Sequence, residues 1–297
     1  MNKKGILQFF LLIFVVHLRL LGVFFGRLPV ISFVDKYIKK RRQAAPDSAP
    51  QNKQQKSGQY TYHELRRNGD TWFYREQPVT GMVYVYHPNG KIEYEIPYAQ
   101  GRIEGTKKEY YENGRLSLEF PYIQGKQEGT EKSYYEKGRL FSETPYHQGE
   151  IHGVQKTYYE KGTLSSETLY QHGKIHGTVK EYHYNGSIME ETPHEQGYKE
   201  GVNKRYHSSG VLQSEHCYEG GWKKGPARYY HENGTLSFEG FYEQDKLNGM
   251  VRSYYKNGKL EKETPYVHGE MHGIEKTYDE NGILIKETPI KYGRHID

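Results

Sequence analysis

The feature that most constrains this chain is a glycine that recurs every 24 residues, nine times in succession. No insertion or deletion interrupts the nine units, and a second glycine series runs at the same interval from Gly90 to Gly282. A repeat of this length predicts an array in which each unit stacks on its neighbours. The first series is Gly81, Gly105, Gly129, Gly153, Gly177, Gly201, Gly225, Gly249 and Gly273.

Three further positions are fixed within the unit: a tyrosine, an apolar residue and a glutamate. Because each recurs in every unit, we interpret these residues, with the first glycines, as structural positions and not as a unique acid–base pair. The tyrosines include Tyr110, Tyr134, Tyr158, Tyr182, Tyr206, Tyr230 and Tyr254. The apolar residues include Leu116, Leu140 and Leu164, and the glutamates include Glu119 and Glu143.

Each unit reads as a β-hairpin, as in "GTKKEYYENGRLSLEFPY". Six of the nine turns are Asn-Gly, which suits a two-residue type I′ turn, while Lys-Gly and Ser-Gly favour a three-residue turn with only the glycine left-handed. The first turn would place Lys108 opposite Glu119, and the second would place Tyr110 opposite Leu116. We expect the second register, because the two constant apolar positions then cover each other.

Composition agrees with a thin β structure. The chain has 30 Tyr and 33 Gly among 297 residues, and only 34% of its residues are hydrophobic. That leaves little aliphatic material for a thick core, yet the 14% aromatic content is too high for a disordered chain. We therefore expect an all-β fold: an elongated, twisted antiparallel array of hairpins that follows an N-terminal hydrophobic helix.

The first 59 residues differ from the repeats. Residues 6–25 form an apolar run of bilayer length, so residues 1–42 are predicted to be an uncleaved membrane anchor with a basic flank. A helix lying in the interface is the alternative. The flank favours a cytoplasmic location for the residues C-terminal to it, and it is a candidate contact for anionic lipids through Lys39, Lys40, Arg41 and Arg42.

The rest of the chain divides into three predicted segments. Residues 43–59 are rich in Pro, Gln and Ser and read as a flexible linker. Residues 60–80 depart from the repeat and are predicted to cap the array. Residues 81–297 hold the hairpin repeats and a short C-terminal tail.

Charge weakens a nucleic-acid interpretation. Residues 1–59 hold 11 of the 42 Lys and Arg but only two of the 37 Asp and Glu, so residues 60–297 carry 31 basic and 35 acidic side chains. A mildly acidic array lacks the basic groove that nucleic acid requires. Cys217 is the only cysteine, which excludes an intramolecular disulfide.

Units such as "NGRLSLEFPYIQGKQEGTEKSYY", and the segment "WFYREQPVTG" that leads into the first unit, resemble the MORN repeat family, most closely its bacterial variant labelled YwqK-type antitoxins. The resemblance covers about residues 74–292. It implies an elongated antiparallel array of hairpins and a role in protein–protein or lipid association. It implies no catalytic residues, and the antitoxin label marks a proposed role without a defined chemistry.

Few residues stand out as candidates for a functional site. Paired histidines such as His172 and His176 could be imagined as metal ligands, but they fall in turn segments and we expect no metal and no cofactor. No phosphate loop or nucleophile motif is present in the sequence, so we expect no catalytic residues. "GWKKGPARYYHENG" departs from the repeat, and Trp222, Lys223 and Lys224 are candidate partner contacts, with simple loop variation as the alternative.

These observations favour a membrane-anchored, non-enzymatic scaffold that binds an unidentified protein partner through a tyrosine-rich β surface. The alternatives are an antitoxin or immunity-type protein that neutralises one toxin, and a lipid-binding tether. An enzyme is the least favoured class. The sequence does not decide which face of the sheet binds.

Overall fold

The structure, a computed structural model, describes residues 58–295. The described residues all belong to one compact unit. The predicted hydrophobic helix, the lipid contacts at Lys39, Lys40, Arg41 and Arg42, and nearly all of the linker lie outside the described residues. Among residues 58–295, no helix is long and apolar enough to cross a membrane.

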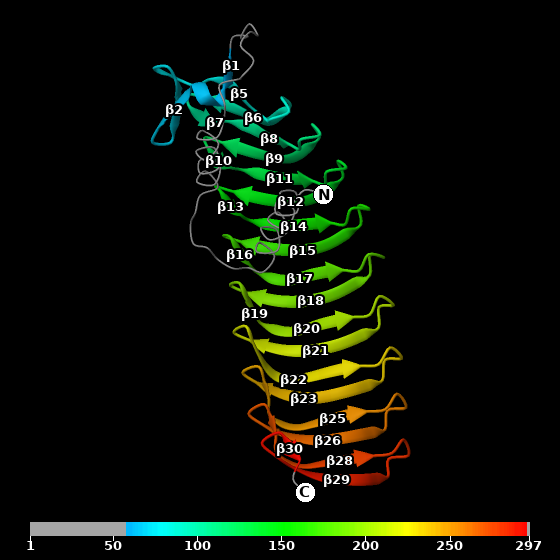
Figure 1. The fold of residues 1–297 in the computed structure, drawn as a ribbon. Helices are drawn as coiled ribbons and strands as arrows, with labels where there is room; N and C mark the ends of the chain where they lie inside the picture. Colours follow the sequence, from blue (N-terminus) through cyan, green and yellow to red (C-terminus); the bar gives the residue numbers. More distant parts are fainter. Residues whose placement is uncertain (1–57, 296–297) are drawn as a thin grey trace. The chain divides into compact units, whose positions relative to one another are not determined.

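The repeats form one continuous antiparallel sheet whose hairpins follow one another in chain order (Figure 1). Each unit, counted from a glycine of the first series, contributes a first strand, a hairpin turn, a second strand and a two-residue strand at the opposite edge. In unit six this short strand is not separate, because Trp222 and Lys223 begin β22. The described residues thus confirm the all-β hairpin array.

The first strands are β5 (Gly81–Tyr86), β8 (Gly105–Tyr110), β11 (Gly129–Tyr134), β14 (Gly153–Tyr158), β17 (Gly177–Tyr182), β20 (Gly201–Tyr206), β22 (Trp222–Tyr230), β25 (Gly249–Tyr254) and β28 (Gly273–Tyr278). The second strands are β6 (Ile92–Ala99), β9 (Leu116–Ile123), β12 (Leu140–His147), β15 (Leu164–Gln171), β18 (Ile188–Glu195), β21 (Leu212–Glu219), β23 (Leu236–Glu243), β26 (Leu260–Val267) and β29 (Leu284–Lys291). The short strands are β7 (Arg102–Ile103), β10 (Lys126–Gln127), β13 (Glu150–Ile151), β16 (Lys174–Ile175), β19 (Tyr198–Lys199), β24 (Lys246–Leu247), β27 (Glu270–Met271) and β30 (Arg294–His295).

The hairpin turns have the predicted three-residue form. Gly114 has a φ of 87°, whereas Asn113 is not left-handed, and the Gly114 N–H donates to the Tyr111 carbonyl at 2.8 Å. Asn is instead favoured by two hydrogen bonds. In unit one, Asn89 accepts from the Lys91 N–H at 3.0 Å and donates to the Glu112 carbonyl of the next unit at 2.8 Å.

The two registers that the sequence left open occur together. Lys108 lies opposite Glu119, as a two-residue turn would require, and Tyr110 also lies opposite Leu116. Both pairings fit because a β-bulge between Glu109 and Tyr110 leaves one extra residue on the second strand. The expected Tyr–Leu register is confirmed, and the ion-pair register was wrongly treated as its competitor.

The left-handed two-residue turns lie at the other edge of the sheet. Gln124 and Gly125 have φ values of 50° and 80°, and Ile123 pairs with Lys126 around them. Most units place a non-glycine residue first, so this edge accepts backbone strain that the hairpin turns avoid.

Residues 58–80 form a structure of their own at the start of the array. β1 (Gln59–Thr61) pairs in parallel with β5, and a short 3₁₀ helix, η1 (Tyr62–Glu64), follows it. β2 (Leu65–Asn68), β3 (Thr71–Tyr74) and β4 (Gln77–Pro78) form a separate three-stranded sheet. Its Trp72 N–H donates to the Gly101 carbonyl at 2.8 Å, which ties this sheet to the edge of unit one.

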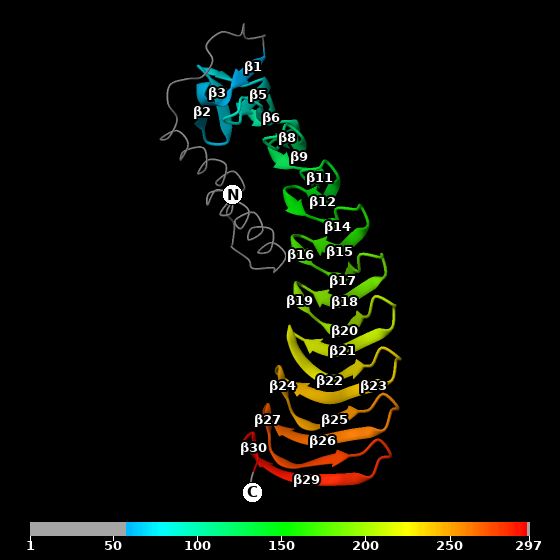
Figure 2. The ribbon, with the colours of Figure 1, turned by 45° about the vertical axis from the view of Figure 1, so that its right-hand side comes forward.

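The long sheet has two unlike faces, because neighbouring residues of a strand point to opposite sides. The strands bend (Figure 2), and the side chains in the middle of one face are buried in a single-layered sheet. We call this the inner face; it carries Lys107 and Phe120 in unit two. The outer face carries Tyr110, Lys108 and Glu119 in the same unit.

Candidate functional site

The outer face holds the units together through its constant residues. The Tyr110 hydroxyl donates to Glu95 of the preceding unit at 2.9 Å, and the Tyr158 hydroxyl donates to Glu143 at 3.0 Å. The same bond crosses every junction between described units, from Tyr110 to Tyr278. The two most regular polar residues of the repeat therefore form one interaction between units.

Burial and the neighbouring carboxylate both favour the neutral phenol in this row. Burial first, and then the hydrogen bond to glutamate, raise the pKa of Tyr110, Tyr134, Tyr182 and Tyr254 to about 12. These tyrosines stay protonated as donors through the physiological range. They are not available as ionised nucleophiles.

Each glutamate of this row also faces a basic side chain. Lys132 lies 3.7 Å from Glu143, and the Arg252 Nε donates to Glu263 at 2.9 Å. The registers within and between hairpins place these residues at one level, so basic and acidic side chains alternate along the outer face. The row is nearly neutral, and its charges are used within the array.

A further link between units was missed by the sequence interpretation. The residue after the fixed tyrosine is often Tyr or His, and its ring bonds the carbonyl of the fixed tyrosine in the next unit. The Tyr111 hydroxyl donates to the Tyr134 carbonyl at 2.6 Å, and His231 Nε2 lies 2.9 Å from the Tyr254 carbonyl. The sequence signal for this link was a repeat position that holds Tyr in some units and His in others.

The fixed glycines and leucines complete the scaffold. Gly105, Gly129 and Gly153 have φ values of 101°, 101° and 112°. A side chain at Gly153 would also come within 3.1 Å of Pro145. Leu116, Leu140 and Leu164 are half-buried beside the bulged tyrosines. The predicted structural residues within residues 58–295 therefore support the array on its outer face or at its edges.

The central row of the inner face has the opposite character, because its side chains change from unit to unit. Its central row pairs one residue of the first strand with one of the second. The pairs are Val83–Ile96, Lys107–Phe120, Glu131–Thr144, Gln155–Thr168, Val179–Thr192, Asn203–His216, Ala227–Gly240, Val251–Thr264 and Glu275–Thr288. Apolar, hydroxyl, amide and charged residues thus occupy equivalent places on one backbone.

A second inner row is mostly aromatic and lies beside the two-residue strands. It consists of Tyr98, Tyr122, Tyr146, Tyr170, His194, Tyr218, Tyr242, Tyr266 and Ile290. Burial raises the pKa of Tyr122 to about 12. This row makes the inner face rich in tyrosine, and it is separate from the fixed tyrosines of the outer face.

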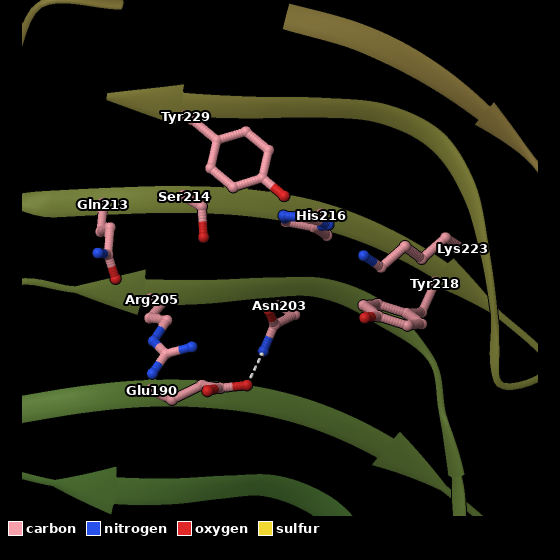
Figure 3. Close-up of a pocket in the computed structure, with 9 residues that line it drawn as sticks. All are labelled: Glu190, Asn203, Arg205, Gln213, Ser214, His216, Tyr218, Lys223 and Tyr229. Atoms are coloured by element: carbon pink, nitrogen blue, oxygen red, sulfur yellow. Dashed lines mark hydrogen bonds between the residues drawn. The ribbon is translucent and has the colours of Figure 1, made fainter. Parts of the chain in front are cut away.

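One stretch of the inner face is hollowed into a polar cavity of about 440 Å³ between units five and seven (Figure 3). Side chains from β18, β20, β21 and β22 point into it. The lining residues are Glu190, Asn203, Arg205, Gln213, Ser214, His216, Tyr218, Lys223 and Tyr229.

The residues at the floor of the cavity are buried, and only some of their polar atoms have hydrogen-bond partners. Asn203 Nδ2 donates to Glu190 at 2.8 Å and to Thr192 at 2.7 Å. His216 is 6% exposed, and its Nδ1 is buried with no hydrogen-bond partner among the described residues. Burial lowers the pKa of His216 to about 4, with a further contribution from the Lys223 charge, so the ring is neutral at physiological pH. Most other units have Thr at the position of His216, and this substitution was the signal that the sequence interpretation overlooked.

The three predicted partner contacts separate in the structure. Lys223 lines the cavity, with its ammonium group 5.2 Å from the centre of the Tyr242 ring. Trp222 pairs with Glu219 on the opposite face and is 59% exposed. Lys224 forms an ion pair with Glu219 at 2.8 Å. Only Lys223 belongs to the candidate site.

The edge histidines approach one another within and between units. The rings of His147 and His152 lie 6.2 Å apart, and those of His152 and His172 lie 5.2 Å apart. The His147 Nδ1 is 2.8 Å from Glu128. Within residues 58–295 no group of three or more His, Cys, Asp or Glu side chains is arranged to hold a metal ion.

Comparison with known proteins identifies the repeat. The model of a family described as MORN repeat variant matches residues 79–100, 103–124, 127–148, 151–172, 175–196, 199–219, 223–244, 247–268 and 271–292. No curated protein matches the chain.

Similarity to solved structures is weak. The crystal structure of TcdB2-TccC3-TEV aligns at 13% identity and a TM-score of 0.19, over 71% of this chain and 14% of that chain. That of TcdB2-TccC3-Cdc42 aligns at 12% identity and a TM-score of 0.19, over 74% of this chain and 14% of that chain. The chain thus spans only a small part of either structure.

Proposed function

The chain belongs to the MORN repeat variant family, and from this premise we propose that it is a non-enzymatic scaffold that binds a protein partner on its inner face. The observation that carries the proposal is the division of labour between the faces. Constant side chains bond to one another on the outer face, while the side chains of the central inner row vary from unit to unit.

In a repeat array, side chains that differ between units of the same backbone conformation are informative. A residue that only supports stacking is under the same requirement in every unit, as the Tyr158–Glu143 bond illustrates. Asn203 and His216 meet no such shared requirement, since other units place Glu, Gln, Val or Thr there. A row whose side chains change along the array gives a surface that can distinguish one partner from another.

The chemistry of the inner face suits a polypeptide. Its aromatic row offers amphipathic contact area with few rotatable bonds, and the cavity adds hydrogen-bonding groups and both signs of charge. Arg205, Lys223 and Glu190 line the same cavity, so a partner that fills it would present charges of both signs. A uniformly basic groove of the kind that follows a nucleic acid backbone does not occur on this face of the described residues.

The anchor is the second part of the proposal. We propose that residues 6–25 hold the scaffold at a membrane, with Lys39, Lys40, Arg41 and Arg42 against anionic headgroups and the array on the cytoplasmic side. An antitoxin or immunity-type protein is one form of such a scaffold, in which the bound partner is a toxin.

Photo-cross-linking in the native cell tests the proposal. A benzophenone amino acid is placed at Tyr218 on the inner face, or at Val202 on the outer face, which is 42% exposed and belongs to the same unit. We expect one dominant protein adduct from position 218, competed by excess unlabelled chain, and little adduct from position 202. Equal cross-linking from both faces would contradict an inner-face site. Cross-linking only to lipid would favour the tether.

A further inference from the structure

The two ends of the long sheet differ in how their edges are covered. At the start, β1 pairs with β5 and the three-stranded sheet lies against unit one. At the other end, β29 pairs with β28 on one side and with β30 only near Ile290 and Lys291. Within residues 58–295, no strand pairs with the outer edge of β29 at Lys286 and Glu287. An uncovered edge of this kind is a template for another strand.

The internal junctions show what such an edge binds. At the preceding junction, Glu263 of β26 lies opposite Lys276 of β28, and the Tyr278 hydroxyl donates to Glu263 at 3.1 Å. The next strand therefore supplies a basic residue opposite the glutamate and a tyrosine two positions later. Seven other junctions repeat the Tyr–Glu bond.

Glu287 is the ninth member of the glutamate row and has no such tyrosine within the described residues. Its carboxylate is 3.4 Å from Lys276 of its own hairpin, and its side chain is 49% exposed. The internal equivalents Glu143 and Glu263 are 30% and 20% exposed. Glu287 therefore retains an acceptor that every preceding glutamate uses between units.

Two side chains beside this edge are apolar at positions where most other units are polar. Ile283 and Ile285 are 63% and 62% exposed, and the positions that match them in unit eight are Lys259 and Glu261. Exposed strand edges usually carry charged or polar side chains. An apolar edge beside an unpaired strand indicates a surface that is covered when the protein is bound to its partner.

Asp279 also sets this unit apart. The other units mostly place Tyr or His here, and several of those rings bond the carbonyl of the next unit. Asp279 instead accepts hydrogen bonds from the backbone of Asn281 and Ile283 in its own turn, at 2.9 and 2.8 Å. The edge thus lacks one link of the internal junction but keeps the glutamate acceptor and the strand backbone.

We propose that the outer edge of β29 binds an extended segment of another polypeptide as an additional antiparallel strand, and that it selects the order basic–acidic–tyrosine. The basic residue would lie opposite Glu287, and its tyrosine would donate to the free Glu287 oxygen, as at the internal junctions. The register Lys262–Thr277 places the middle residue opposite Lys286, where an acidic side chain finds a positive charge. Such strand addition is a common mode of peptide recognition.

A second copy of this chain fits the edge less well. If two β29 edges paired with their faces continuous, Glu287 would lie opposite an odd-numbered residue of the copy, because facing residues share a side of the sheet. The odd-numbered residues nearby are Ile285, Glu287 and Pro289, and none of them is basic. This favours a different polypeptide.

The test uses the full chain in mild detergent and a fluorescent peptide with the sequence of residues 177–187, "GTVKEYHYNGS". This peptide carries the order basic–acidic–tyrosine at Lys180, Glu181 and Tyr182. We expect saturable binding by fluorescence anisotropy. Replacing the peptide tyrosine by Phe, or Glu287→Gln in the protein, should each weaken binding about tenfold, the effect of losing one hydrogen bond to a charged group.

A charge exchange sharpens the result. Glu287→Lys should abolish binding of the original peptide and restore it for a peptide with Lys180→Glu. Glu263→Gln is the matched control, because its acceptor is already used by Tyr278, and it should leave peptide affinity unchanged. The proposal would be overturned if wild-type protein bound the original and the Lys180→Glu peptides with equal affinity, or if no saturable binding were seen. It would also be overturned if Glu287→Gln left binding unchanged, or if the protein formed a dimer that Glu287→Lys abolished.

Discussion

In unit one the central inner row is buried as aliphatic side chains, with Val83 and Ile96 at 0% and 4% exposure, and Leu65 and Val79 of the preceding segment are 2% and 1% exposed. In units three to five the corresponding inner row is buried as hydroxyl groups, with Thr144, Thr168 and Thr192 at 3%, 8% and 6%. The same hairpin backbone is thus stabilised by apolar burial at one end and by polar contacts in the middle. This repeat therefore does not need an apolar core in each unit, provided that the units bond to each other.

That reliance on bonds between units predicts the largest effect, a collective loss of the central array at high pH. Tyr134 and Tyr182 have pKa values of about 12, above the ordinary value of roughly 10. Their contribution is complete below pH ~10 and is lost as the pH rises through ~12. After allowance for solvent screening we expect on the order of 1 kcal/mol per tyrosine, summed over several junctions.

Tyrosinate absorbance and circular dichroism, followed together, check this expectation. The central sheet should unfold in the same interval in which the phenols ionise. Ionisation near pH ~10 with the sheet intact would show that the Tyr–Glu bonds contribute little.

The N-terminal end should respond most to loss of apolar volume. We expect Leu65→Ala to destabilise residues 58–103 by about 2–4 kcal/mol, because a buried cavity replaces the side chain. Hydrogen exchange read by mass spectrometry would localise the change. Val154→Ala, at a residue that is 45% exposed, is the matched control and should have almost no effect. Equal effects of the two variants would remove the distinction between the ends.

In the central units a single hydroxyl should matter. Tyr158→Phe removes the hydrogen bond to Glu143 and keeps the ring, and we expect a loss of about 1–2 kcal/mol in the stability of units three and four. Tyr158→Ala should cost more, since ring packing is also lost. Urea unfolding measures both variants. If Tyr158→Ala melted like the wild type, the tyrosine row would not be part of the packed structure.

The polar cavity of units five to seven predicts a smaller acid effect. The pKa of His216 is lowered to about 4 by burial, so its neutral ring favours the folded state above the unfolded-state pKa of about 6.5. This contribution is lost as the pH falls through ~4, and we expect it to be on the order of 1 kcal/mol. His216→Thr restores the residue of neighbouring units and should flatten stability between pH ~6.5 and ~4. If the loss of stability below pH ~6.5 were the same in that variant, protonation of carboxylates would be its cause.

The smallest effect is expected from the outer ion pairs. Lys132 and Glu143 are 44% and 30% exposed and 3.7 Å apart, so Lys132→Ala should cost less than about 1 kcal/mol and become neutral in high salt. Thermal melting at two salt concentrations measures this. A larger, salt-resistant loss would mean that the alternating charge row acts as a cooperative network.

The sequence predicted the part of the fold that depends on local chemistry. The glycine interval gave the repeat, the turn residues gave the hairpin, and apolar complementarity gave the Tyr110–Leu116 register. It misread the function of Asn at the turn, because a hydrogen bond to the next unit is invisible until the units are stacked. It also treated Trp222 and Lys223 as one surface, although strand alternation sends them to opposite faces.

The sequence by itself thus determined that this protein is a nine-unit array of antiparallel hairpins with a fixed backbone register. Local preferences suffice for that result, because each unit repeats the same short-range pattern. The tertiary structure adds that the sheet bends, which face holds the buried side chains, and that Asn203 and His216 lie in a cavity with residues of other units. Those features arise from the twist and stacking of many strands, and no single 24-residue unit encodes them.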